Sequence, residues 1–204
     1  MALFRWLSRF IAPRDTPADP PEWEEYAAIT EALRNNDLAK LDLFARTVPG
    51  FPHGNDRPLG RSWLVNAIDL GGMESIVWVL DQIRRVEFYD EDERSPLTAA
   101  IERQWPVLGH QDDTHKVVAL LIERGACVDT PDPTFGNTPL HVAAAHGTAK
   151  TINLLLDFGA DPLAWNKDSF GPEQPVGFVD AKKRPEIHEL LLSAMRSAEM
   201  PSAP

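Results

Sequence analysis

An internal repeat constrains the fold of this 204-residue chain more than any other feature. The clearest copy covers residues 136–166 and reads GNTPLHVAAAHGTAKTINLLLDFGADPLAWN. A second copy, SWLVNAIDLGGMESIVWVL, aligns Leu64, Ala67 and Gly71 with Leu140, Ala143 and Gly147 of the clear copy. A third copy, SPLTAAI, places Leu97 and Ala100 at the same leucine and alanine positions. The sequence therefore predicts a series of similar units stacked along one axis.

Two weaker copies flank these three. The upstream copy lies in residues 27–45 and the downstream copy in residues 170–195. Leu64 and Leu97 are 33 residues apart, whereas Leu97 and Leu140 are 43 apart, because residues are inserted near 104–113. We therefore expect five units over residues 22–198.

The residues of the clear copy predict two helices in each unit. Thr138 can cap the first helix, and Pro139 then occupies the first helical turn, where its missing N–H costs nothing. The His141 imidazole can return a hydrogen bond to Thr138. Thr148 can cap the second helix, and Gly159 suits the left-handed position that ends it.

The pattern G-x-T-P-L-H-x-A-A-x-x-G, followed by L-L-L-x-x-G-A-D, resembles the ankyrin repeat family. The resemblance is clear in residues 136–166, extends through 62–129 and is weaker at both ends. It implies an all-α solenoid of about five stacked helix pairs with projecting hairpin-like loops. There are departures: Ile83 stands where the family pattern has a helix-ending glycine, and Thr98 and Gly177 replace the histidine.

Outside the repeats the chain divides into short segments. Residues 1–11 form an amphipathic stretch, residues 12–21 a proline-rich linker and residues 199–204 a tail. The first segment can pack on the stack, lie on a membrane or bind a groove of a partner. Its apolar residues are interrupted by Arg5 and Arg9, so a secretory signal is not expected, and we expect a cytoplasmic location.

Composition narrows the function classes. The formal charge of −11 disfavours contact with a nucleic-acid backbone and favours a protein partner with a basic surface. It also disfavours stable membrane attachment. No nucleophile, phosphate-binding or metal-ligand motif is present, so we expect no enzyme activity, cofactor, metal or small-molecule substrate.

Candidate partner-binding residues come from the loops and from repeat positions expected on the concave face. Residues 87–93, here called the acidic loop, carry five carboxylates and two aromatic rings. Aromatic residues in two other loops are further candidates. The full set is Glu87, Phe88, Tyr89, Asp90, Glu91, Asp92, Glu93, Asp69, Glu102, Arg103, Phe135, His146 and Trp165.

Ankyrin stacks present their loops and first helices as a surface that binds proteins, and this resemblance implies a non-catalytic binding module. A narrower hypothesis is an inhibitor or immunity protein that blocks a basic toxin or enzyme. The alternative is a membrane-associated adaptor that uses residues 1–11 to reach lipid while the stack recruits a partner protein.

Overall fold

The computed structural model describes residues 21–86, 88–90, 93–103, 113–167, 171 and 173–200. Residues 1–11, most of the linker and residues 201–204 lie outside this part of the chain. The helices are α2 (Pro21–Arg34), α3 (Leu38–Thr47), α4 (Trp63–Leu70), α5 (Met73–Gln82), α6 (Pro96–Glu102), α7 (Thr114–Glu123), α8 (Pro139–His146), α9 (Ala149–Asp157), the 3-10 helix η1 (Pro175–Phe178) and α10 (Pro185–Glu199).

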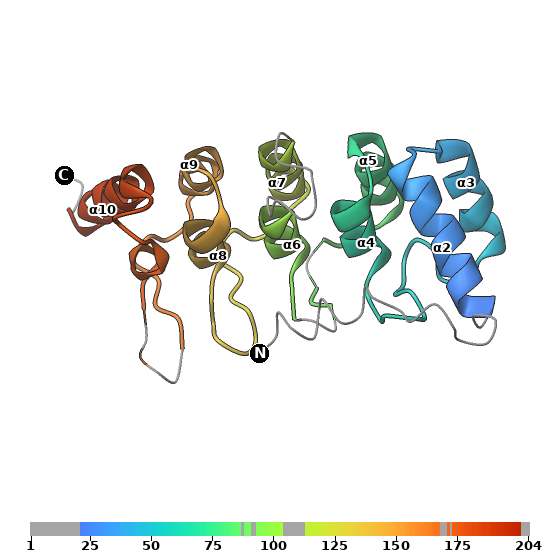
Figure 1. Cartoon of the computed structure of the whole chain (residues 1–204), viewed down its shortest axis with the longest axis horizontal. Coiled ribbons are helices and arrows are strands. Elements are labelled where there is room, and N and C mark those ends of the chain that lie inside the picture. The colour runs from blue at the N-terminus through green and yellow to red at the C-terminus, as the bar shows by residue number, and fades with distance from the viewer. Residues whose placement is uncertain are drawn as a thin grey trace.

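These helices form five pairs that stack in sequence order, from α2 and α3 at one end to η1 and α10 at the other (Figure 1). No β-strand occurs in the described residues, so the expected all-α solenoid is confirmed. The folded unit reaches one residue beyond 22–198 at each end, because α2 begins at Pro21 and α10 ends at Glu199.

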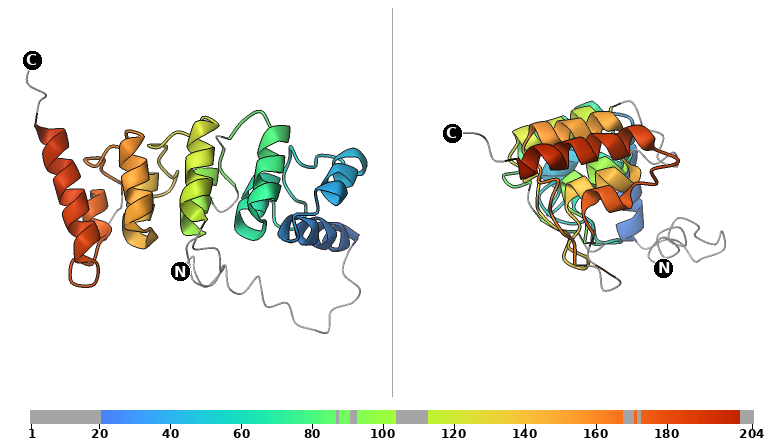
Figure 2. Two further views of the ribbon diagram at one scale, coloured as in Figure 1. Left: turned by 90° about the horizontal axis from the view of Figure 1, so that it is seen from above. Right: turned by 90° about the vertical axis from the view of Figure 1, so that its left-hand side faces the viewer.

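The pairs build two parallel rows. Helices α4, α6, α8 and η1 pack on one another in succession, while α7, α9 and α10 do the same in the second row. The loops between pairs project to one side of the stack, as the end-on view of Figure 2 shows. We call these loops the first finger (residues 48–62), the second (83–95), the third (124–138) and the fourth (158–174).

The repeated apolar positions supply the core. Leu64, Leu97 and Leu140 are almost completely buried, and so are Ala67, Ala100 and Ala143. Burial of each leucine contributes about 1.5 to 3 kcal/mol, while the small alanines let neighbouring helices approach closely. The residues that define the repeat in the sequence are therefore the ones that hold the stack together.

The glycine after the first helix of a unit has a steric cause. A Cβ atom on Gly147 would lie 2.7 Å from the carbonyl oxygen of Ala143, and one on Gly71 would lie 2.7 Å from that of Ala67. Real Cβ atoms essentially never approach so closely. Glycine therefore recurs here because the chain passes tightly across the end of its own helix.

The predicted caps are present. The Thr138 N–H donates to Nδ1 of His141 at 3.1 Å, and the Thr138 hydroxyl lies 2.9 Å from the same nitrogen. Because Nδ1 accepts, the ring hydrogen sits on Nε2, which lies 3.0 Å from the Glu173 carbonyl oxygen and donates to it. Burial lowers the pKa of His141 and favours this neutral form. Thr148 caps α9 by accepting from the Thr151 N–H at 3.3 Å.

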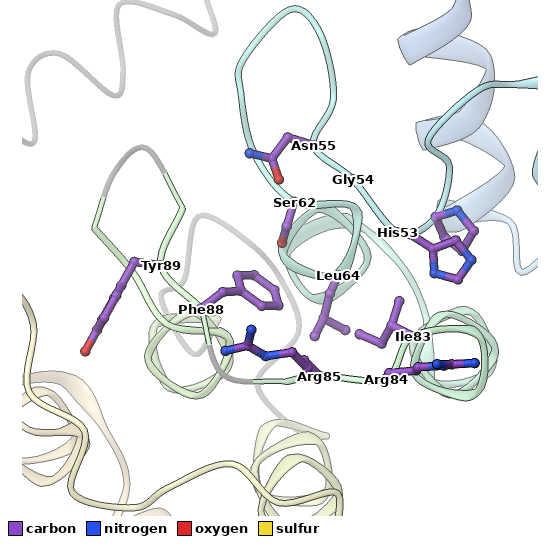
Figure 3. A pocket seen from close by; sticks show the side chains of 11 residues that line it. His53, Gly54, Asn55, Ser62, Leu64, Ile83, Arg84, Arg85, Phe88 and Tyr89 are labelled. Atoms are coloured by element: carbon purple, nitrogen blue, oxygen red, sulfur yellow. The ribbon is translucent and has the colours of Figure 1, made fainter.

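The exit from α5 differs from the exits of α7 and α9. Gly125 and Gly159 follow those helices with φ of +96° and +87°, the left-handed turn that the sequence predicts for Gly159. Ile83 ends α5 in an extended conformation instead, with φ −95° and ψ 154°. Residues 83–85 therefore run past the beginning of α4 and bring Ile83 close to Leu64 (Figure 3).

Candidate protein-binding surface

Each finger is closed by a backbone hydrogen bond at an aspartate or asparagine, whose side chain adds further hydrogen bonds. In these closing bonds a backbone N–H donates to a backbone carbonyl oxygen at 2.7 to 3.0 Å. The donor and acceptor residues are Asp56 and Arg61, Asp90 and Arg94, Asp132 and Asn137, and Asn166 and Glu173. The side chain of each donor residue also accepts a backbone N–H from the same finger. In the second finger, for example, the Arg94 N–H donates to Asp90 Oδ1 at 2.9 Å. This recurring residue gives the fingers a fixed shape.

Hydrogen bonds also join the second, third and fourth fingers. The Tyr89 hydroxyl donates to the Pro131 carbonyl oxygen at 2.5 Å, and the Thr134 hydroxyl donates to the Glu93 carboxylate. Between the third and fourth fingers, the Lys167 N–H donates to the Phe135 carbonyl oxygen at 2.6 Å. Three consecutive fingers therefore form one connected row, which we call the finger row.

Large aromatic side chains stand out from the finger row. Phe158 is 44% exposed where the fourth finger leaves α9, and three further exposed rings lie within the loops. Tyr89 on the second finger, Phe135 on the third and Trp165 on the fourth are 40%, 50% and 62% exposed. Sequence reasoning named all three as contact candidates, and the stack distributes them over three successive fingers. Exposed aromatic rings on a rigid backbone are typical anchors of protein interfaces.

The acidic loop contributes less free charge than the sequence suggests. Asp90 was expected among exposed contact residues, but it is buried and forms an ion pair with Arg94, 3.2 Å from Oδ2 to Nη2. Phe88 is half-buried and packs against the core. Glu93 is exposed, whereas Glu87, Glu91 and Asp92 lie outside the described residues.

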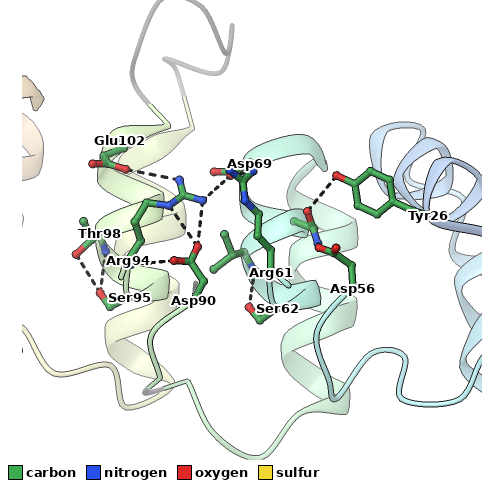
Figure 4. Close-up of polar contacts among 12 residues, drawn as sticks. Tyr26, Asp56, Arg61, Ser62, Asp69, Asp90, Arg94, Ser95, Thr98 and Glu102 are labelled. Carbon is green, nitrogen blue, oxygen red and sulfur yellow. Dashed lines mark hydrogen bonds and ion pairs between the residues drawn. The ribbon is translucent and has the colours of Figure 1, made fainter. Parts of the chain in front are cut away.

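Arg94 also forms ion pairs with two carboxylates on the first helices of two neighbouring pairs (Figure 4). Its guanidinium lies 3.0 Å from Asp69 of α4 and 3.6 Å from Glu102 of α6, and Arg61 lies 3.9 Å from Asp69. Asp69 is buried, so its expected role as an exposed contact is wrong: stacking places it against Arg94. We call these residues, together with Asp90, the Arg94 cluster.

The electrostatics of the Arg94 cluster follow from burial. Burial raises the pKa of Glu102 to about 7, although the nearby Arg94 charge opposes this shift. Burial alone lowers the pKa of Arg94, but Asp69, Asp90 and Glu102 together outweigh it and raise the pKa. The cluster therefore holds the second finger to α4 and α6 with charged groups that depend on one another.

Two other expected concave-face residues have different surroundings. Arg103 is buried, and its Nη2 donates to the Gly71 carbonyl oxygen at 2.8 Å, so the expectation of an exposed charge is wrong here too. Burial lowers the pKa of its guanidinium. The arginine ties the end of one unit to the preceding unit. His146 lies exposed at the end of α8.

The described residues hold no group of three or more histidine, cysteine, aspartate or glutamate side chains placed to bind a metal ion. Within the same ranges, no helix combines the length and apolar character needed to cross a bilayer. The inserted residues 104–112 lie outside these ranges.

Comparison with known proteins decides the family. A family model for ankyrin repeats in three copies matches residues 64–166, half of the chain. The chain belongs to the ankyrin repeat family. Ankyrin repeats are protein–protein interaction modules, and the matched residues include Tyr89, Phe135, Trp165 and every member of the Arg94 cluster except Arg61.

Similar ankyrin-repeat proteins are much longer than this chain. It is 30% identical over 139 residues, 67% of its length, to ankyrin repeat domain-containing protein 63 of Homo sapiens, and spans 34% of that protein. It is 29% identical over 157 residues, 72% of its length, to the ankyrin repeat and KH domain-containing protein mask-1 of Caenorhabditis elegans, and spans 6% of it. It is 33% identical over 102 residues, half of its length, to the probable E3 ubiquitin-protein ligase XBOS34 of Oryza sativa subsp. japonica, of which it spans 18%.

Proposed function

We propose that this ankyrin stack is a non-catalytic binding module whose protein partner rests on the finger row. The observation that carries the proposal is the set of exposed rings of Tyr89, Phe135 and Trp165 on three fingers that hydrogen bonds connect. Large rings supply apolar contact area and lose little conformational entropy on binding.

The connected backbone supports this assignment. Asp132 accepts the N–H groups of Phe135 and Asn137 at 2.6 and 2.8 Å, which fixes the turn that presents the Phe135 ring. Asn166 donates to the Asn137 side chain at 2.9 Å and so anchors the chain beside Trp165. A surface shaped in advance loses less free energy to ordering when a partner binds.

The charge of the chain supports a partner with a basic surface. The net charge is −11, and Glu93 remains exposed at the edge of the second finger beside Glu91 and Asp92 in the sequence. Acidic groups near an interface mainly raise the rate of encounter with a basic partner. An inhibitor or immunity protein that covers the basic groove of a toxin or enzyme is one form that such a module takes.

Replacement of Glu91, Asp92 and Glu93 by serine is expected to slow association several-fold at low salt, with a smaller effect at physiological ionic strength, where screening acts over about 8 Å. Asp90 is left unchanged because it belongs to the Arg94 cluster. Surface plasmon resonance with the partner at two salt concentrations measures the rates.

The matched control replaces Glu186, Glu189 and Glu199 of α10 by serine, which removes the same charge from the far end of the stack. Equal association rates for the two triple variants at both salt concentrations would show that the acidic loop has no special part in steering the partner.

A further inference from the structure

A groove opens between the first and second fingers, beside the beginning of α4 (Figure 3). It encloses about 560 Å³, within the range of about 300 to 1,000 Å³ typical of ligand sites. Leu64, Ile83 and Phe88 give it an apolar base. The extended exit from α5 at Ile83, which replaces the glycine turn of the other units, forms one of its walls.

The rim of the groove is cationic. Arg84 and Arg85 border it from the second finger, and His53 borders it from the first; all three side chains are exposed. Neither arginine forms an ion pair with any described residue. None of the described residues that line the groove is an aspartate or a glutamate, although the whole chain is strongly acidic.

Three described aspartates lie near the rim residues in the sequence, and each is bonded elsewhere. Asp81, which precedes Arg84 by three residues, is paired with Arg124 at 3.0 Å. Asp56 accepts from the Leu59 N–H at 2.6 Å and from the Asn66 side chain at 2.7 Å. Asp90 is paired with Arg94. No carboxylate of the described residues is therefore paired with Arg84 or Arg85, and both guanidinium groups are exposed toward a carboxylate from outside the chain.

We propose that this groove binds an extended peptide segment of a partner in which an aspartate or glutamate neighbours a large apolar residue. The carboxylate pairs with Arg84 and Arg85, whose planar guanidinium groups hold carboxylates through paired hydrogen bonds. The apolar side chain enters the groove and covers Leu64, Ile83 and Phe88. Tyr89 of the finger row also borders this groove, whereas Phe135 and Trp165 do not line it, and the proposal does not depend on those two rings.

Nuclear magnetic resonance titration of the ¹⁵N-labelled chain tests this proposal without a known partner. Two libraries of short peptides carry a large apolar residue at one fixed position and uncharged residues elsewhere. The residue before it is Asp or Glu in the first library and Asn or Gln in the second. We expect the first library to shift the amide signals of residues 53–55 and 83–85, and to saturate at a concentration about tenfold lower than the second.

The variant Arg84→Ser/Arg85→Ser is expected to weaken binding of the acidic library about tenfold or more. Arg46→Ser/Arg196→Ser removes the same charge from exposed positions on α3 and α10 and serves as the control, with less than about a twofold loss expected. Equal binding of the two libraries, equal losses in the two variants, shifts confined to other residues, or no shifts up to about 5 mM peptide would each overturn the proposal.

Discussion

Leu155→Ala is expected to lower the free energy of unfolding by about 2 to 5 kcal/mol. Leu155 lies in α9 with no solvent exposure, and α9 packs against α7 on one side and α10 on the other. Truncation removes apolar contacts and leaves a cavity between second helices. Because a repeat couples only to its neighbours, we expect η1 and α10 to unfold first.

Urea unfolding followed by circular dichroism and by amide hydrogen exchange measures both effects. Leu43→Ala in α3 is the control: that leucine is 55% exposed, and its loss is expected to change stability by less than about 0.5 kcal/mol. If Leu155→Ala changes stability as little as the control does, the register of the repeats is wrong.

Arg94→Met is expected to cost about 3 to 5 kcal/mol at pH 7 to 8, because it leaves buried carboxylates without their cation. Asp69 and Asp90 are buried, and Arg94 lies within hydrogen-bond distance of both. Arg124→Met is the matched control, since Arg124 forms a similarly short ion pair with Asp81 at 3.0 Å in a largely exposed setting. An exposed pair of that kind contributes about 0 to 1 kcal/mol.

The cost of Arg94→Met should depend on pH with a definite sign. Burial raises the folded-state pKa of Glu102 to about 7, and the Arg94 charge opposes that shift, so removal of the guanidinium raises this pKa further. A carboxyl group with a raised folded-state pKa stabilises the fold at low pH, where it is protonated, and loses that contribution as pH rises.

The stability gap between wild type and Arg94→Met should therefore widen from about pH 5 to pH 8. Denaturant midpoints at three pH values measure it. A gap that is constant over this range, or no larger than that of Arg124→Met, would show that the Arg94 cluster does not hold the second finger in place.

Local residue patterns predict the fold well because the same residues define the repeat and fill the core. Thr138 and His141 form the predicted hydrogen bonds, and Gly159 adopts the left-handed turn that the sequence requires. Each of these features depends on residues a few positions apart. The stack then follows because the same helix pair is repeated along the chain.

The polar contacts were harder to predict because they join residues from different units. Asp69 and Glu102 occupy equivalent repeat positions, and sequence reasoning assigned both to an open concave face. Only stacking brings Arg94, which immediately precedes the Ser95 cap, within 3.0 and 3.6 Å of them. The involvement of an arginine from the second finger was not visible in the spacing of the acidic residues.

One signal for the burial of Asp90 was present in the sequence. Asp56, Asp90 and Asp132 each precede the Ser or Thr cap of the next unit by five or six residues. An aspartate that recurs at one repeat position points to a structural role in the turn. Judged by charge alone, residues 87–93 look like an exposed acidic loop. Because an aspartate recurs at the position of Asp90 in other units, Asp90 could have been assigned a structural role that its neighbours do not share.

The central claim is that a protein partner rests on the finger row, and the dissociation rate of the complex tests it most directly. The variant Phe135→Ala/Trp165→Ala removes two exposed rings whose side chains form no hydrogen bond in the described structure. Leu43→Ala/Met200→Ala removes exposed apolar side chains from the two ends of the stack instead. Both variants should fold as the wild type does.

The test uses a partner isolated by its binding to the intact chain, and surface plasmon resonance measures the dissociation rate. Phe135→Ala/Trp165→Ala should dissociate about 30-fold faster than the wild type or more, because loss of one interface anchor costs about 2 kcal/mol of binding free energy. Leu43→Ala/Met200→Ala should dissociate at the wild-type rate. A dissociation rate of Phe135→Ala/Trp165→Ala equal to that of the control would contradict the assignment of the finger row as the binding surface.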